Sequence, residues 1–137
     1  MAYKKVYLDI NIVLDILDNS RQYSKEAKLL WQKIVEFDSE VVISEDMLST
    51  IYYIHKDKSH TLEFLGTIKE IWTISSFGKD VINRAIEVSL RKQLDFENVL
   101  QCLCAKKNEC DMLITNDNKF YDCGINVYSS KEFLDEQ

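Results

Sequence analysis

The sequence predicts an α/β fold in which a central parallel sheet is flanked by helices on both faces. Short apolar runs alternate along the chain with longer stretches of helical periodicity, which is typical of this class. The runs are continuously apolar, as expected for strands buried on both faces of a parallel sheet. The 137 residues contain no proline, repeat or low-complexity linker, and they indicate one domain over 1–137.

In order, the first half is expected to form strand 6–8, helix 11–18, helix 24–37, strand 41–43 and a helix from 44 to about 54. The helices carry apolar residues at spacings of three and four, whereas each strand is a run of three apolar residues. Ser24 and Ser44 stand where two of these helices start. A serine side chain accepts a hydrogen bond from the free N–H groups of a helix start, so both are expected to act as caps.

In order, the second half is expected to form helix 59–70, strand 71–74, helix 76–91, helix 95–107, strand 112–114, a strand near 126–128 and a helix from about 130. Asp95 is expected to cap the helix that it begins. Each strand but the last pair is separated from the next by helix, and such crossovers join parallel strands. The expected sheet therefore has five strands.

The overall charge does not indicate broad nucleic-acid binding, because the formal net charge is −6 and phosphate contact favours basic surfaces. No apolar run approaches the roughly 20 residues of a membrane span. The first nine residues hold no apolar run long enough for a signal peptide. We therefore expect a cytoplasmic protein with no membrane association.

The four cysteines are expected to be buried or half-buried free thiols. Cys102 and Cys104 stand two apart in a helical stretch, so they point to different faces. Cys110 and Cys123 have no partner at the spacing typical of zinc sites. This spacing argues against both a zinc site and a disulfide framework.

Carboxylates follow two of the expected strands. Asp9 ends the first strand and Asp117 follows the fourth. Sites in open parallel sheets form beyond the carboxyl ends of strands, where the strand order reverses. An acidic crevice there suits Mg²⁺ or Mn²⁺. The alternatives are a turn residue for Asp9 and an Asx turn or helix cap for Asp117, but a carboxylate between apolar runs is costly without a partner.

Three stretches resemble motifs of the PIN domain family in order and spacing. They are "YLDINIVLDIL" (7–17), "DFENVLQ" (95–101) and "LITNDNKF" (113–120), and "VISEDMLSTIYYI" (42–54) fits the second strand and following helix of that family. The resemblance covers nearly the whole chain. Each motif alone is a weak signal, whereas three in the right order are fairly specific.

The resemblance implies a Rossmann-like fold and an acidic cluster that binds Mg²⁺ or Mn²⁺ and cleaves RNA. Many small members are VapC-type toxins, so it also implies an antitoxin partner and a homodimer. Asp9 matches the first catalytic aspartate of the family and Asn11 the polar residue two positions on. Asp117 matches the late acid, and Thr115 the threonine before it.

Two positions depart from the family pattern. Thr50 stands where the family has a glutamate, and Asn98 where it has its third acid. Asp95 is three residues before Asn98 on the same helical face, so its side chain can reach the crevice as a catalytic acid. The alternative is that Asp95 caps the helix, and both roles are possible together. Glu97 is expected to point elsewhere.

Other side chains receive simpler expectations. Lys119 is the best single candidate for a phosphate contact, and Asn98 is expected to bind a water molecule or to pack. Asp15 is expected on a helix surface, and the alternative is a role in supporting the residues that form the site. Tyr52, Tyr53 and Phe64 are expected either in a subunit interface or in the core.

The function expected from these observations is metal-dependent hydrolysis of RNA phosphodiester bonds by a toxin of a toxin–antitoxin pair, with activity reduced by the two departures. The alternative is a catalytically silent PIN domain that binds RNA or a protein. A general nucleotide-binding domain fits less well, because the chain has only three glycines and no Gly-rich phosphate loop.

Overall fold

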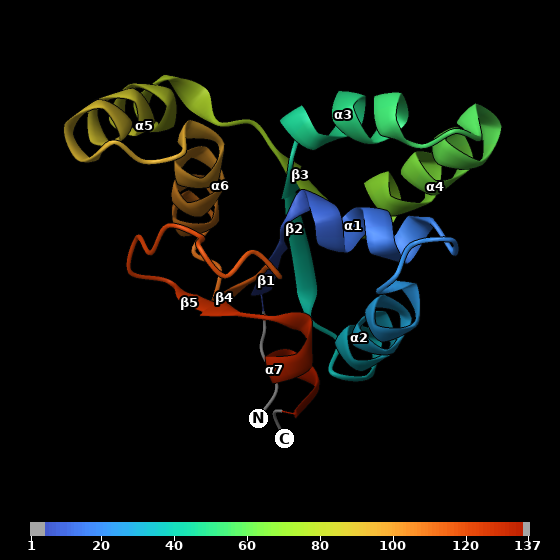
Figure 1. Cartoon of the computed structure of the whole chain (residues 1–137). Coiled ribbons are helices and arrows are strands. Elements are labelled where there is room, and N and C mark those ends of the chain that lie inside the picture. Colours follow the sequence, from blue (N-terminus) through green and yellow to red (C-terminus); the bar gives the residue numbers. More distant parts are fainter. Residues whose placement is uncertain (1–4, 136–137) are drawn as a thin grey trace.

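The computed structural model describes residues 5–135 and has the expected parallel sheet at its centre (Figure 1). The strands are β1 (Lys5–Leu8), β2 (Glu40–Ser44), β3 (Thr73–Ser75), β4 (Met112–Ile114) and β5 (Asn126–Tyr128). They pair in the order β3-β2-β1-β4-β5, and every pairing is parallel. The predicted α/β fold with five strands is therefore confirmed.

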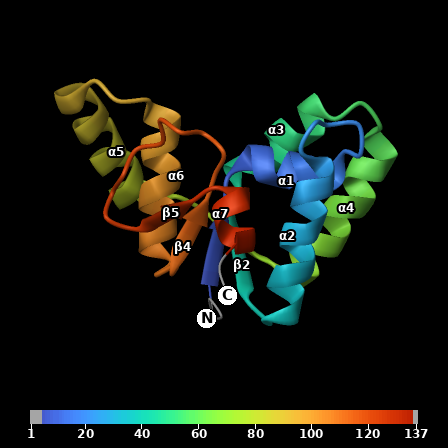
Figure 2. The same ribbon diagram turned by 60° about the horizontal axis from the view of Figure 1, so that its bottom comes forward.

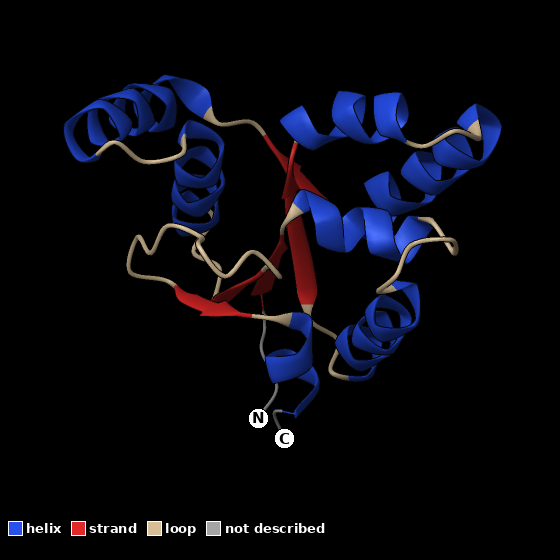
Figure 3. Ribbon diagram, in the orientation of Figure 1, coloured by secondary structure: helices blue, strands red, loops and turns tan. Residues whose placement is uncertain are grey.

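Helices cover both faces of this sheet (Figures 2 and 3). They are α1 (Ile10–Leu17), α2 (Ser24–Glu36), α3 (Asp46–Ile54), α4 (Lys58–Ile71), α5 (Gly78–Lys92), α6 (Phe96–Lys107) and α7 (Ser130–Asp135). α1 to α4 lie on one side, α5 and α6 lie on the other, and α7 packs beside α2 (Figure 1). Within the described residues, no helix is long and apolar enough to cross a membrane.

The strand order reverses at β1. The chain steps from β1 through β2 to β3, then returns across the sheet through α5 and α6 to β4, on the other side of β1. Parallel crossovers are right-handed, so this reversal moves the connecting helices to the opposite face. The carboxyl ends of β1 and β4 consequently lie side by side, where Leu8 pairs with Ile114.

The core has two parts. The larger one lies around the sheet and includes the fully buried Tyr7, Leu30 and Phe133. The smaller one lies between α5 and α6, and its buried members are Val81, Ala85, Val88, Val99 and Leu100. α6 contributes Cys104 and Ala105 to the larger part and Val99 and Leu100 to the smaller one. Packing against both parts holds this helix in place beside the sheet.

Neither expected serine cap is present. α2 is preceded by Tyr23, no side chain caps it, and Ser24 is a buried residue of the helix itself. Ser44 is the buried last residue of β2. The strand pairing continues one residue further, because the Glu45 N–H donates to Ser75 O at 2.8 Å, so α3 begins only at Asp46.

We predict that Phe133→Ala destabilises the chain by about 3–5 kcal/mol, because it removes a fully buried aromatic ring and leaves a cavity. The Phe133 ring also lies 5.0 Å below the Lys33 ammonium, so the substitution removes a cation–π contact as well. Urea unfolding followed by circular dichroism measures the change. Leu29→Ala is the matched control, since Leu29 is 54% exposed and should change stability by less than about 0.5 kcal/mol.

Candidate active site

The candidate site lies where β1 and β4 end. Asp9 directly follows β1 and is 9% exposed, and its backbone N–H donates to Ile114 O at 3.0 Å. Each carboxylate oxygen of Asp9 accepts one hydrogen bond. Oδ2 accepts from the Thr115 hydroxyl at 2.7 Å, and Oδ1 accepts from the Ile10 N–H at 2.9 Å at the start of α1. Asp9 thus joins β1, β4 and α1.

Burial makes Asp9 electrostatically unusual. Desolvation raises the pKa of this carboxyl above its ordinary value, and the charge of Asp117 raises it further. The hydrogen bonds from Thr115 and from the Ile10 N–H act in the opposite direction, because they favour the ionised form. A cation beside Asp9 would relieve both the desolvation and the repulsion.

Asp117 is connected to Asp9 through Thr115. The buried Thr115 hydroxyl donates to Asp9 and accepts the Asp117 N–H at 3.1 Å. Asp117 Oδ2 accepts from Asn98 Nδ2 at 3.3 Å, and Oδ1 accepts from the Lys119 N–H at 2.9 Å. Thr115 therefore links the two aspartates beyond the ends of β1 and β4, and we call this region the crevice. The Asx turn expected as an alternative for Asp117 is present as well.

Asp95 caps α6. Its Oδ1 accepts from the Asn98 N–H at 3.0 Å, as the sequence predicts. The second carboxylate oxygen has no hydrogen bond among the contacts of the described residues. The cap holds Asn98 at the helix start, from which its amide reaches Asp117.

Glu97 does not join the contacts between Asn98 and Asp117. It is exposed, and its Oε1 accepts from Gln101 Nε2 at 3.5 Å, one turn further along α6. Desolvation raises the pKa of Glu97, and the charges of Asp46, Asp95 and Asp9 add to the shift. That Glu97 points away from the site stays a prediction.

An acidic residue, Asp46, lies on α3 near Thr50, the position where the family has a glutamate. Thr50 is exposed and lines a shallow hollow together with Tyr52, Tyr53 and Lys58. Asp46 stands four residues earlier, on the same face of α3. Within residues 5–135, no group of three or more His, Cys, Asp or Glu side chains is placed to hold a metal ion.

Sequence reasoning also missed the burial of Asp15. This residue is 5% exposed rather than on the helix surface, and its Oδ1 accepts from Arg21 Nε at 2.7 Å. Arg21 Nη2 donates to Asn11 Oδ1 at 3.1 Å. The signal in the sequence is the spacing of Asn11 and Asp15, four residues apart on one face of α1.

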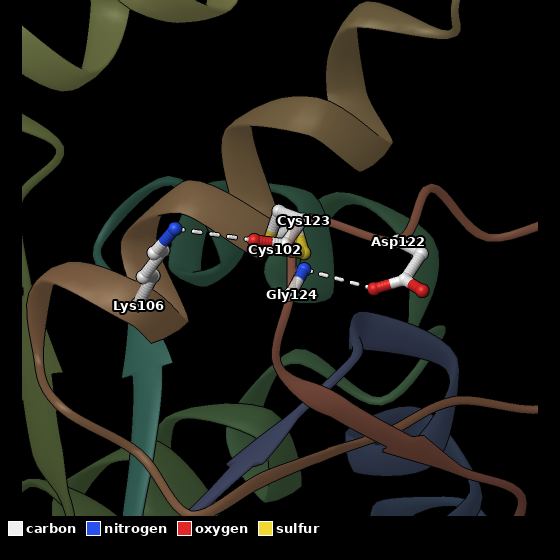
Figure 4. The surroundings of a disulfide bond; sticks show 5 residues. All are labelled: Cys102, Lys106, Asp122, Cys123 and Gly124. Carbon is white, nitrogen blue, oxygen red and sulfur yellow. Dashed lines mark hydrogen bonds between the residues drawn. A yellow bond between two sulfur atoms is a disulfide. The ribbon is translucent and has the colours of Figure 1, made fainter.

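A disulfide fastens the segment that carries Asp117. Cys102 of α6 is bonded to Cys123 in the connection between β4 and β5, with a Cα–Cα distance of 6.0 Å (Figure 4). Lys106 Nζ donates to Cys123 O at 3.3 Å, so α6 holds this connection at two points. The expectation of free thiols is wrong for this pair, because sequence spacing does not report proximity across the fold.

The other two cysteines are free and buried, as expected. Cys104 points away from Cys102 into the larger core. Burial raises the pKa of the Cys110 thiol to about 12, and burial also raises the pKa of Cys104. Both are therefore protonated and unreactive near neutral pH.

The comparisons with known proteins agree with this geometry. The PIN domain family model matches residues 5–119. The chain belongs to the PIN domain family. It is 30% identical to Ribonuclease VapC1 of Aquifex aeolicus (strain VF5), over 98% of this chain and 96% of that protein.

Solved structures share the fold at lower identity. One is the crystal structure of Mycobacterium tuberculosis VapC20, described as a sarcin-ricin loop cleaving toxin. It has a TM-score of 0.71 at 13% sequence identity, and the match covers 88% of this chain and 95% of the VapC20 chain. A chain of a toxin–antitoxin complex from Klebsiella pneumoniae has a TM-score of 0.70 at 20% sequence identity, and the match covers 93% of this chain and 98% of that chain.

We predict that reduction of Cys102–Cys123 loosens residues 116–125, because the bond then no longer holds this connection to α6. Reduction should lower stability by roughly 3 kcal/mol, the value expected for closing a loop of this size. Hydrogen exchange by mass spectrometry should show faster exchange in 116–125 and unchanged exchange in β4. The variant Cys102→Ser with Cys123→Ser should reproduce the reduced chain.

Thiol counting provides the control for this prediction. After unfolding without reductant, iodoacetamide should label two cysteines, Cys104 and Cys110, and after reduction it should label four. Labelling of four thiols in the unreduced chain would show that the disulfide does not form.

Proposed function

We propose that this chain is a ribonuclease toxin of a toxin–antitoxin pair and hydrolyses RNA phosphodiester bonds with the help of Mg²⁺ or Mn²⁺. The observation that carries the proposal is the buried Asp9 carboxylate, held by Thr115 beside Asp117 at the reversal of the strand order. The similarity to Ribonuclease VapC1 over nearly the whole length supports the reaction class.

The donor set fits a hard cation that keeps most of its water. Asp9 and Asp117 would hold the ion, since each of their oxygens accepts one hydrogen bond and retains a further lone pair. Mg²⁺ is often bound through one or two carboxylates plus substrate phosphates. The bound ion would supply charge neutralisation as negative charge develops on the phosphate.

The chain's own residues would orient the substrate and complete the electrostatics. Asp95 would act as a catalytic acid through Oδ2, because Oδ1 already accepts the Asn98 N–H at the helix cap. Asn11 and Lys119 would contact RNA phosphates as hydrogen-bond donors. Thr115 and Asn98 would keep Asp9 and Asp117 in place, with Asn98 facing the substrate side of Asp117.

A second candidate function rests on the two departures. Asn98 donates its amide to Asp117, whereas a carboxylate at this position would instead add a third acid to the crevice. With Thr50 exposed on α3, the chain also lacks an acid at a second position where the family has one. A catalytically silent domain that binds RNA or a protein is the function favoured by that arrangement.

The partners we propose are RNA, an antitoxin protein and a second copy of this chain, in the cytoplasm. Exposed apolar side chains on two helices support self-association. Tyr53 of α3 is 84% exposed and Tyr52 is 40% exposed, whereas Phe64 packs against Trp72 with a ring distance of 6.1 Å. On α5, Ile82, Ile86 and Leu90 form an exposed stripe at a spacing of four.

Acids placed at positions 50 and 98, where the family has them, are predicted to strengthen metal binding. Asn98→Asp together with Thr50→Glu should tighten Mn²⁺ binding and raise cleavage of single-stranded RNA, because two anionic oxygen ligands are added. In chelator the same variant should unfold at lower temperature, since the new carboxylates repel Asp9 and Asp117. Calorimetric Mn²⁺ titration and thermal unfolding measure the two effects.

Two further variants control this experiment. Asp9→Asn should abolish RNA cleavage without lowering stability, because it removes a charge whose burial is unfavourable. Asp80→Asn makes the same chemical change at an exposed position of α5 and should alter neither property. Tight Mn²⁺ binding and strong cleavage by the original chain would show that the alignment of the departed positions is wrong and that Glu45, Asp46, Asp95 or Glu97 supplies the missing ligands.

We predict a dimer in sedimentation experiments at concentrations on the order of tens of micromolar, as for a moderately stable interface. Tyr53→Glu should shift the equilibrium toward the monomer, because it places a charge on an exposed apolar surface that association would bury. Leu29→Glu, at an exposed apolar position of α2, is the matched control. Sedimentation of the original chain as monomer alone would contradict the proposal.

A further inference from the structure

A fixed hydrogen-bond network stands at the start of α1, beside the crevice. It joins Asn11, Asp15 and Arg21. Arg21 lies outside the PIN-like stretches, and Asp15 lies in the stretch 7–17 but matches none of its site positions. Asn11 is the second residue of α1, and Asp9 caps the same helix. Asn11, the member of the network nearest to Asp9 in the chain, is therefore within one helical turn of the Asp9 backbone.

Asp15 determines where Arg21 lies. A carboxylate that is 5% exposed needs a charged partner, and Arg21 supplies it through Nε at 2.7 Å. The planar guanidinium has little freedom once Nε is committed, because its five N–H groups have a fixed geometry. Its Nη2 is then directed at Asn11, at 3.1 Å.

Arg21 determines which way the Asn11 amide faces. A guanidinium offers only donors, so the Asn11 atom that faces it must be the acceptor Oδ1. The Nδ2 group, with two N–H donors, is consequently turned away from Arg21. Asn11 is exposed, and no other described side chain takes up its Nδ2 group by a hydrogen bond.

The crevice needs donors of this kind. Asp9 and Asp117 are joined there through Thr115, so a phosphodiester that approaches them from solvent meets negative charge. Donor groups are what bind the non-bridging oxygens of a phosphate. A fixed amide N–H beside Asp9 offers such a contact without removing an acid from the site.

We propose that Arg21, held by Asp15, is a positioning residue that orients the Asn11 amide so that Nδ2 donates to a phosphate oxygen of the RNA beside Asp9. The inference rests on the proposed function for the identity of the ligand. It goes beyond that function in assigning a role to Arg21 and Asp15, and in specifying which amide atom of Asn11 faces the substrate.

The test uses two substitutions that keep the network folded. Asn11→Asp retains an acceptor for Arg21 and replaces the outward donor by a carboxylate oxygen, which repels a phosphate. Arg21→Lys keeps the positive charge for Asp15 but loses the planar fork that also reaches Asn11. Lys25→Gln is the control, since it removes a positive charge from an exposed position of α2.

Two measurements are made on each full-length variant. Fluorescence anisotropy of a labelled single-stranded RNA in chelator reports binding without cleavage, and steady-state cleavage in Mn²⁺ separates KM from kcat. Arg21→Lys should weaken RNA binding and raise KM about tenfold, and Asn11→Asp should do so more strongly. Lys25→Gln should change binding by less than about threefold, and thermal unfolding should place all three variants near the original chain.

The outcomes separate this inference from the proposed function. Binding that depends on Arg21 and Asn11 in a chain that does not cleave RNA would overturn the nuclease and retain the inference. Cleavage with binding and KM unchanged in both variants would retain the nuclease and overturn the inference. A fall in stability alone, with unchanged RNA binding, would show that the network only holds the connection from α1 to α2. Absence both of RNA binding in chelator and of RNA cleavage in Mn²⁺ by the original chain would overturn both.

Discussion

The hydroxyl group of Thr115 is the contact on which the site depends. It donates to the buried Asp9 carboxylate and accepts the Asp117 N–H, so one side chain joins the ends of β1 and β4 and sets the turn that follows. Asp9 is unfavourable where it lies, because its burial is only partly offset by two hydrogen bonds. The unfavourable burial of Asp9 occurs at the reversal of the strand order. There a parallel sheet can present groups from two neighbouring strands to one crevice.

The sequence predicts the sheet well because β1, β2 and β4 contain buried apolar runs and most of the strands are separated by helices of clear periodicity. The PIN motifs also locate Asp9 and Asp117 at strand ends that prove to be adjacent. Local capping rules were less reliable. Ser44 lies inside the strand pairing rather than at a helix start, since tertiary hydrogen bonding at Glu45 overrides the preference of serine for a cap.

The features that the sequence did not predict depend on contacts between distant elements. Cys102 and Cys123 meet because the connection from β4 to β5 folds back on α6 (Figure 4). Asp15 is buried because a residue six positions later folds back to pair with it. Spacing rules describe neighbours on one helix, and they contain no information about such returns.

Asn98 gives the site a property that a carboxylate would not. Its amide donates to Asp117, so without a cation this contact is attractive. Aspartate at the same place would oppose Asp117 and require a cation to balance the charge. We therefore expect weak cation binding in the absence of RNA. On the proposed function, the phosphate would contribute more to holding the ion than in a site with more acids, so binding of the metal would be coupled to binding of the RNA.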